Sequence, residues 1–240
     1  MIDEELSRIR AFYGARDSAS EFARYSLFRR GELYMRHDRE DAILKSMRRQ
    51  GITSISDIDI LEVGCGRGDK LADFQRWGAD PQRLHGIDLL ENYVVSATAA
   101  NPGYAFVCGS AASLPYPSNC FDIVSQFTVV SSILNEQVRI QVAREMTRVA
   151  RPGGFILWYD FRFPSPGNNN VRPVTKSELF RLFPGMDIDM CSVTLLPPVA
   201  RLLAPLSTIM ASLLSLVPLF RSHYVAVIKI PKKKKYAFNS

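Results

Sequence analysis

The chain has 240 residues, of which 47% are hydrophobic and 22% carry a charge. This is the composition of a globular protein and excludes a largely disordered chain, and the length suits one α/β domain with additions. A net charge of +6 is compatible with nucleic acid, anionic lipid or an acidic substrate, and equally with an ordinary basic surface. The four cysteines lack CxxC or metal-site spacing, so we expect reduced thiols in a cytoplasmic protein without a bound metal.

Residues 1–50 begin with MIDEELSRIR, a charged segment without the apolar stretch of a secretory signal. The region is rich in arginine and aromatic residues. Ile43, Leu44 and Met47 recur at helical spacing just before Gly51. We therefore expect residues 1–50 to form helices.

Short β-rich runs alternate with helical runs between residues 58 and 161. The runs expected as strands are 58–63, 83–90, 104–109, 121–127 and 153–161. Helices are expected between them, including one around Glu136 to Val149 on which Val138 and Val142 share a face. This alternation predicts βαβ units and a parallel sheet with helices on both faces.

The sequence RFPSPGNNNVRP after Phe161 predicts a loop. Thr175 and Glu178 then have the spacing of a capping box at the start of a short helix. Further strands are expected at 187–196 and 223–230.

An apolar insertion, residues 197–221, separates these last two strands, and residues 202–220 carry no charge. Its length nearly suits a bilayer, but Pro205 and Pro218 interrupt it and a return to the sheet excludes a membrane span. We expect helices here, and three roles for them stay open. The helices cover a ligand pocket as a hairpin, or they form a dimer contact, or residues 199–221 and the lysine-rich tail contact the inner membrane surface.

The most informative string is LEVGCGRG, residues 61–68, which lies between a predicted strand and a predicted helix. In a doubly wound sheet this turn is at the carboxyl edge, where ligands bind, and its glycines let the backbone approach a ligand closely. The spacing differs from the dinucleotide fingerprint GxGxxG, because Asp69 occupies the place of the third glycine. This disfavours a nicotinamide-dependent reductase.

Two carboxylates indicate the ligand that the glycine turn would hold. Glu62, two residues before the first glycine, would attract an ammonium group and repel a pyrophosphate. Asp88, at the end of the second predicted strand, can accept hydrogen bonds from both ribose hydroxyls. The pattern predicts a nucleoside that carries an amino acid.

These motifs resemble the class I S-adenosylmethionine-dependent methyltransferases, in particular the small-molecule group with the type 11 methyltransferase domain. The matching strings, in order, are LEVGCGRGD, GIDL, GSAASLPYPSNCFDIV and EMTRVARPGGFILWYDF. The resemblance implies a Rossmann-like, doubly wound sheet of seven strands in which the last, antiparallel strand (223–230) lies beside 153–161. It also implies a methyltransferase domain over 51–240 and a helical cap, residues 1–50, over the cofactor site.

The resemblance further implies S-adenosylmethionine as the cofactor and assigns residues to each part of it. The methionine part would be lined by Glu62, Gly64, Cys65, Gly66 and Gly68. The ribose and adenine would contact Asp88, Leu89, Gly109, Ser110 and Ala111, and the sulfonium would lie near Gln126 and Phe127. Many relatives have an aspartate where Ser110 stands, although a hydroxyl can also accept a hydrogen bond.

Methyl transfer needs an aligned acceptor, and a hydroxyl acceptor also benefits from a general base. Asp160, at the end of the fifth strand, is one candidate base, with an ion pair to Arg162 as the alternative. His223, at the start of the last strand, is the other. The residues expected near the acceptor are Phe127, Arg162, His37, Tyr13 and Tyr25, with a surface position for His37 and simple helix packing for the tyrosines as alternatives.

The sequence disfavours a nucleic-acid acceptor. The string SQFTVVSS lacks the Asn/Asp-Pro-Pro-aromatic motif of enzymes that methylate base amino groups, and no array of basic and aromatic residues is present. We expect O-methylation of a small apolar, lipid-linked or sugar-linked metabolite. The alternatives are C- or N-methylation of a natural product or quinone-type acceptor, and a scaffold protein that binds S-adenosylmethionine without catalysis.

Overall fold

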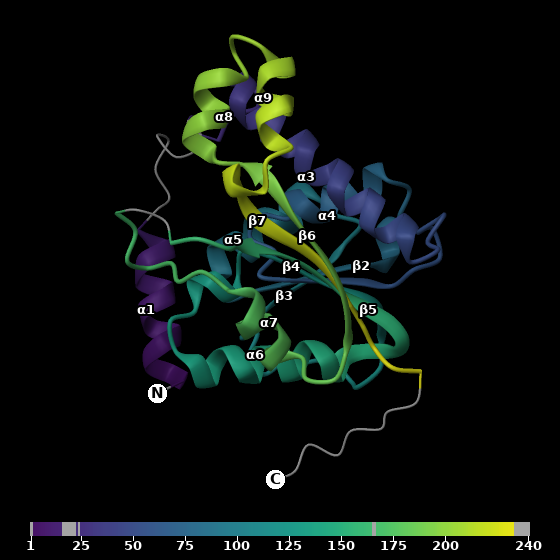
Figure 1. Ribbon diagram of the computed structural model, residues 1–240. Helices are drawn as coiled ribbons and strands as arrows, with labels where there is room; N and C mark the ends of the chain where they lie inside the picture. The colour runs from purple at the N-terminus through teal and green to yellow at the C-terminus, as the bar shows by residue number, and fades with distance from the viewer. Residues whose placement is uncertain (1, 16–22, 24, 165–166, 233–240) are drawn as a thin grey trace.

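The computed structural model describes residues 2–15, 23, 25–164 and 167–232. One sheet contains seven strands in the order β3-β2-β1-β4-β5-β7-β6 (Figure 1). Their bounds are β1 (Ile60–Val63), β2 (Leu84–Asp88), β3 (Ala105–Cys108), β4 (Phe121–Phe127), β5 (Ala150–Phe161), β6 (Asp187–Leu195) and β7 (Arg221–Lys229). β1 to β5 pair in parallel, whereas β7 lies antiparallel between β5 and β6. The predicted seven-stranded, doubly wound sheet with an antiparallel last strand is confirmed.

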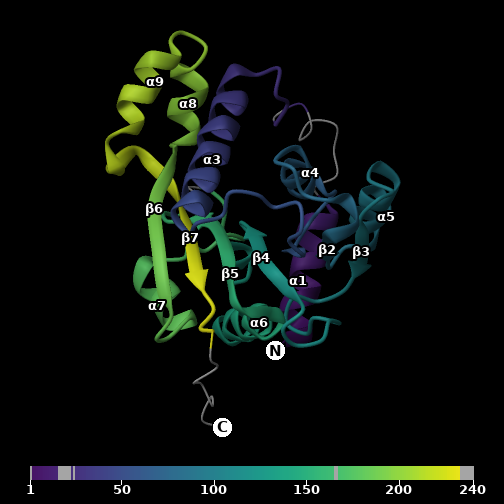
Figure 2. The same cartoon turned by 90° about the vertical axis from the view of Figure 1, so that its right-hand side faces the viewer.

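Helices pack on both faces of this sheet (Figure 2). Their bounds are α1 (Ile2–Gly14), α3 (Arg30–Arg49), α4 (Asp69–Arg76), α5 (Glu91–Ala100), α6 (Glu136–Val149), α7 (Lys176–Leu182), α8 (Pro197–Leu203) and α9 (Thr208–Ser215), with single 3₁₀ turns at Pro81–Arg83, Val130–Ser132 and Pro218–Phe220. One core contains apolar residues of α6 and α7 with Ile9 of α1 against it, and the other contains residues of α3 and α4.

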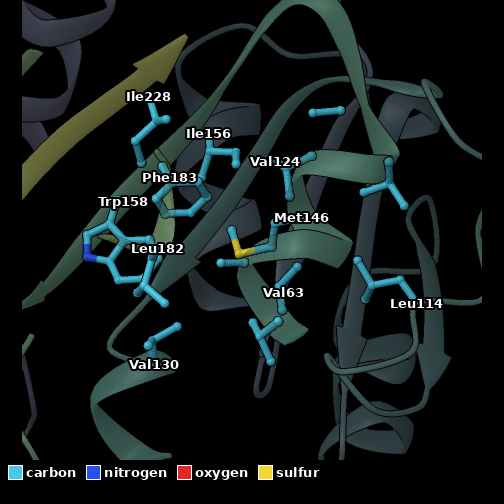
Figure 3. Close-up of a cluster of buried hydrophobic side chains, with 14 of the residues drawn as sticks. Val63, Leu114, Val124, Val130, Met146, Ile156, Trp158, Leu182, Phe183 and Ile228 are labelled. Carbon is cyan, nitrogen blue, oxygen red and sulfur yellow. The ribbon is translucent and has the colours of Figure 1, made fainter. Parts of the chain in front are cut away.

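The core beneath α6 shows why this segment is helical. Val138, Val142, Met146 and Val149 recur every three or four residues and are all buried. Asn135 begins the helix, because its side chain accepts the backbone N–H groups of Gln137 and Val138. Figure 3 shows the Met146 side chain of α6 among apolar side chains of the sheet.

Only one of the two hydrogen bonds of the predicted capping box forms at the start of α7. Thr175 Oγ1 accepts the backbone N–H of Glu178 at 3.2 Å, as the spacing predicts. The Glu178 carboxylate does not reach back to the cap. It accepts hydrogen bonds from Arg139 at 2.9 Å and Arg172 at 2.8 Å instead, which ties α7 to α6.

The N-terminal helices do not form one cap. Ile43 and Met47 of α3 are buried in the core beside α4, whereas α1 packs on the opposite face through Ile9. The boundary at residue 50 therefore falls within a shared core, and its use as a domain limit stays a prediction.

The apolar insertion is helical, as expected, and forms a hairpin of α8 and α9 beyond the end of the sheet, beside the start of α3 (Figures 1 and 2). Its small residues Ala200, Ala204 and Ala211 are fully buried with Leu195 and Met35. In the part of the chain that the structure describes, no helix has both the length and the apolarity to cross a bilayer. The lysine-rich tail lies outside the described residues from position 233 onward.

Candidate active site

Two cavities open at the carboxyl ends of the parallel strands. The first encloses about 240 Å³ and the second about 800 Å³. Gly64, Gly66, Phe127 and Thr128 line both of them. The glycine turn after β1 and the turn after β4 therefore form the junction at which the two cavities meet.

The glycine turn has a backbone that only glycine adopts readily. Gly64, Gly66 and Gly68 have φ angles of +69°, +54° and +85°. The backbone N–H groups of Gly64 and Cys65 both donate to the carbonyl oxygen of Ile87, at 2.8 and 3.0 Å. This pins the turn to the end of β2. Gly68 lines neither cavity; it precedes α4, and its φ shapes the entry into that helix.

Glu62 carries an unsatisfied buried oxygen at the second cavity. The residue is 1% exposed, and its Oε2 has no hydrogen-bond partner. Burial raises the pKa of this carboxyl well above its ordinary value. A ligand that brings a positive charge and N–H donors to Oε2 would satisfy it.

A cation with an unsatisfied donor lines the same cavity. Arg39 of α3 has a buried Nε without a hydrogen-bond partner, and its guanidinium is 3.8 Å from the Asp73 carboxylate. Lys70 also lines the cavity, and burial lowers its pKa. A carboxyl oxygen and a guanidinium nitrogen that both lack a hydrogen-bond partner in one cavity match the ammonium and carboxylate groups of an amino acid.

Asp88 lies at the first cavity and is held by backbone donors. Its Oδ2 accepts the N–H of Gly66 at 2.8 Å, and its Oδ1 accepts the N–H of Leu90 at 3.0 Å. Burial raises the pKa of the Asp88 carboxyl, and these two hydrogen bonds oppose the rise. Each oxygen keeps a second lone pair, so the carboxylate can still accept two hydroxyls.

The rest of the first cavity is largely apolar and suits a flat aromatic ring. Its walls come from α1, from the ends of β2 and β3, from α5 and from α6, and include Leu6, Ile9, Tyr13, Leu89, Tyr93, Gly109, Ser110, Ala111, Val138 and Val142. The Ser110 hydroxyl accepts the N–H of Ala112 at 3.2 Å. Four residues expected near the adenine, namely Leu89, Gly109, Ser110 and Ala111, line this cavity, and so does Tyr13, which was expected near the acceptor.

The far wall of the second cavity is an aromatic stack on β5 and β7. The His223 ring lies 4.5 Å from the Tyr159 ring at an interplanar angle of 8°, and 4.2 Å from the Phe161 ring. His223 Nδ1 is 2.8 Å from the Ser222 hydroxyl. Burial lowers the pKa of His223 to about 3, so the imidazole is neutral near pH 7. His223 thus remains a candidate to accept a hydrogen bond from an acceptor hydroxyl.

Asp160 lies behind this wall, contrary to the expected position. Tyr159 and Phe161 line the second cavity, and because strand side chains alternate, Asp160 points to the other face. Its Oδ2 accepts the N–H of Ser131 at 3.0 Å, its Oδ1 accepts its neighbour Phe161's N–H at 2.9 Å, and burial raises its pKa to about 6. A direct proton transfer from an acceptor in the second cavity does not fit this geometry.

Arg162 does not pair with Asp160. Its guanidinium donates to the carbonyl oxygen of Pro218 at 2.9 Å and lies over the rings of Phe163 and Tyr224. It therefore braces the last turn before β7.

Gln126 and His37 also lie apart from the cavities. Gln126 is fully buried; its Oε1 accepts the N–H of Val129 at 2.9 Å, and its Nε2 donates to Asp160 at 3.4 Å. It shapes the turn after β4 from beneath. His37 is exposed on α3, which is the surface position held as its alternative, whereas Tyr25 lines the rim of the second cavity.

Four residues of the second cavity were not predicted from the sequence, namely Arg39, Lys70, Thr128 and Tyr159. Arg39 lies one helical turn before the buried Ile43, so the helical period could have placed it over the sheet.

Comparison with known proteins agrees with this geometry. Residues 61–158 match the family model described as a methyltransferase domain. The demethylmenaquinone methyltransferase of Lactococcus lactis is 29% identical over 126 residues, covering 50% of this chain and 48% of that protein. The fatty-acid O-methyltransferase of Mycolicibacterium smegmatis is 35% identical over 105 residues, covering 43% and 37%. These matches span less than half of the relatives' length.

Solved structures share the fold at low identity. The [4+2]-cyclase SpnF superposes with a TM-score of 0.60 at 18% identity, covering 81% of each chain. An S-adenosylmethionine-dependent methyltransferase from Mesorhizobium loti gives a TM-score of 0.56 at 16% identity, covering 77% of this chain and 96% of that chain.

Proposed function

We propose that the chain is a class I S-adenosylmethionine-dependent methyltransferase, as the methyltransferase-domain match of residues 61–158 supports, and that it methylates an oxygen of a small, apolar acceptor. The observation that carries the proposal is the pair of unsatisfied groups, Glu62 Oε2 and Arg39 Nε, in a cavity that joins the cavity of Asp88. S-adenosylmethionine, when bound, supplies an electrophilic methyl group on its sulfonium. Its ammonium and carboxylate groups complement the charges of Glu62 and Arg39, and its ribose hydroxyls can donate hydrogen bonds to Asp88.

The residues would divide the cofactor between the two cavities. Glu62 would accept the ammonium group, and Arg39, with Lys70, would bind the carboxylate. Asp88 would accept the ribose hydroxyls, and the apolar first cavity would hold the adenine. The shared junction at Gly64 and Thr128 then leaves the remaining space of the second cavity to an acceptor.

The acceptor side of the second cavity is aromatic and apolar. Phe161, Phe163 and Val199 line it together with the stacked Tyr159 and His223. Two relatives, named for demethylmenaquinone and for fatty acid, support an apolar acceptor. With a pKa near 3, the His223 imidazole is a weak base, so its larger contribution would be to orient an acceptor hydroxyl.

Two alternatives have their own support. C-methylation of a quinone-type acceptor is favoured by the demethylmenaquinone methyltransferases among the relatives. Binding without methyl transfer is the other alternative, because one fold can serve several activities and a chain titled as a [4+2]-cyclase has this fold.

Calorimetry tests the cofactor, and isotope transfer tests the reaction. The intact chain is titrated with S-adenosylmethionine, S-adenosylhomocysteine and NADPH, and so are Glu62→Ala and Asp88→Ala. We expect micromolar binding of the first two ligands, lost in both variants. Absence of binding, or a preference for NADPH, contradicts the proposal. Transfer of a labelled methyl group to extracted apolar hydroxyl compounds then separates an enzyme from a scaffold.

A further inference from the structure

The α8–α9 hairpin presents an apolar face that the described chain leaves uncovered. Seven large side chains on it are between 57% and 76% exposed, namely Leu202, Leu206, Ile209, Met210, Leu213, Leu216 and Leu219. The opposite side of the same hairpin is well packed, because Ala200, Ala204 and Ala211 are fully buried. The hairpin is therefore an ordered element with one inward and one outward apolar side, and an outward side of this size marks an interaction surface.

The exposed face continues onto the segment before α3. Arg30 Nη1 donates to the carbonyl oxygen of Pro205 at 3.3 Å, and Gly31 lies directly against the backbone of Arg201. Phe28, two residues before Arg30, is fully exposed. Both views show the start of α3 beside the hairpin at one end of the molecule (Figures 1 and 2). The apolar surface thus belongs to that end rather than to a single helix.

The charges at this end favour an anionic partner. Residues 196–220, which include the hairpin, contain no Asp or Glu, and their one charged residue is Arg201. Arg29 and Arg30 border the hairpin, while Glu32 is already paired with Arg201 at 2.7 Å. An isologous contact between two copies would bring these arginines together, and Glu32, the carboxylate beside them in the described part of the chain, is already paired, whereas anionic headgroups would neutralise them.

We infer that the outward face of the α8–α9 hairpin docks on an anionic lipid bilayer, with its apolar side chains inserted at the interface and Arg29 and Arg30 against the headgroups. The base of the same hairpin, Pro197 to Val199, lines the second cavity. A docked protein would therefore hold that cavity close to the lipid. Delivery of an apolar acceptor from the lipid rests on the proposed function, but the docking itself does not.

Vesicle sedimentation with the full chain tests the docking. Vesicles of phosphatidylcholine alone are compared with vesicles containing one part in three of phosphatidylglycerol. We expect binding to the second kind, reduced at least tenfold by Ile209→Asp with Leu213→Asp. Arg29→Gln with Arg30→Gln should remove the preference for anionic vesicles. Val95→Asp is the matched control, because Val95 is a 62% exposed apolar residue on α5, and it should bind as the unaltered chain does.

Two further measurements keep the test decisive. Circular dichroism establishes that each variant is folded, and Leu206→Asp at the turn of the hairpin replaces any variant that is not. Equal vesicle binding by the hairpin variants and the unaltered chain would overturn the inference. A dimer in light scattering that the hairpin variants convert to monomer, without vesicle binding by the unaltered chain, would also overturn it and assign the face to a second copy.

Discussion

Gly64 and Val129 interlock at the junction of the two cavities. A Cβ atom placed on Gly64 would lie 2.3 Å from Cγ2 of Val129, far inside any contact distance between carbon atoms. Gly64 also has a φ of +69°. The turn after β1 and the turn after β4 approach each other closely at Gly64. Only a residue without a side chain fits both this close approach and the positive φ.

Replacement of Gly64 by alanine should therefore destabilise the protein by about 2 to 4 kcal/mol, the sum of the left-handed backbone and the overpacking. Urea unfolding measures this. Gly64→Ala combined with Val129→Ala should recover the overpacking part. Gly51→Ala is the control, since Gly51 has a φ of +82° but open space around its Cβ. Equal losses for Gly64→Ala and Gly51→Ala would contradict the steric explanation.

The order of strands and helices was predictable because each depends on local pattern, as with Val138 and Val142 of α6. The sequence did not show which side chains of the central strands face the cavities. β5 is buried on both faces at its centre, so it reads as a continuous apolar run and gives no sign that Tyr159 rather than Asp160 faces the cavity. The helical period places Arg39 on the same face of α3 as Ile43, but the cavity that this face meets depends on how α3 packs against distant strands.

The buried pair of Arg139 and Glu178 should be costly to break. Arg139 is fully buried and donates to Glu178 at 2.9 Å, and burial lowers the pKa of the guanidinium. Glu178→Ala would leave that charge without its partner, so we expect a loss of about 3 kcal/mol in the free energy of unfolding. Glu136→Ala, which breaks an exposed pair with Arg181, should cost less than about 1 kcal/mol. Similar thermal midpoints for the two variants would refute this ranking.

Asp160 should make stability depend on pH. Burial raises its pKa to about 6 in the fold, from an ordinary value of 3.8. The folded state therefore keeps a proton that the unfolded chain has already lost, and stability falls as the pH rises through this window. Relative to Asp160→Asn, the unaltered chain should lose about 2 kcal/mol between pH 4.5 and 7.5. Urea unfolding at both pH values checks this, and a pH-independent difference would show that the carboxyl ionises normally in the fold.

Substitutions that remove single charges should separate the two ends of the cofactor site. Glu62→Gln and Arg39→Met each remove a charge that the amino-acid end of S-adenosylmethionine would need, whereas the first cavity and Asp88 stay intact. Glu62→Gln should weaken S-adenosylmethionine by about a hundredfold, since it leaves the ligand's ammonium group unpaired in a buried site. Arg39→Met should weaken it by a smaller factor, because Lys70 remains in the cavity beside the ligand's carboxylate. Binding of 5′-methylthioadenosine, which lacks the amino-acid end, should change less than about twofold.

Asp88→Asn is the matched comparison, because it should weaken both ligands alike if the ribose binds there. Glu62→Gln should not lower the stability of the ligand-free protein, since the carboxylate it replaces has a buried oxygen without a partner. Calorimetry with the two ligands and urea unfolding give both readouts. If Glu62→Gln weakened 5′-methylthioadenosine as much as S-adenosylmethionine, Glu62 would be shaping the glycine turn rather than binding an ammonium group.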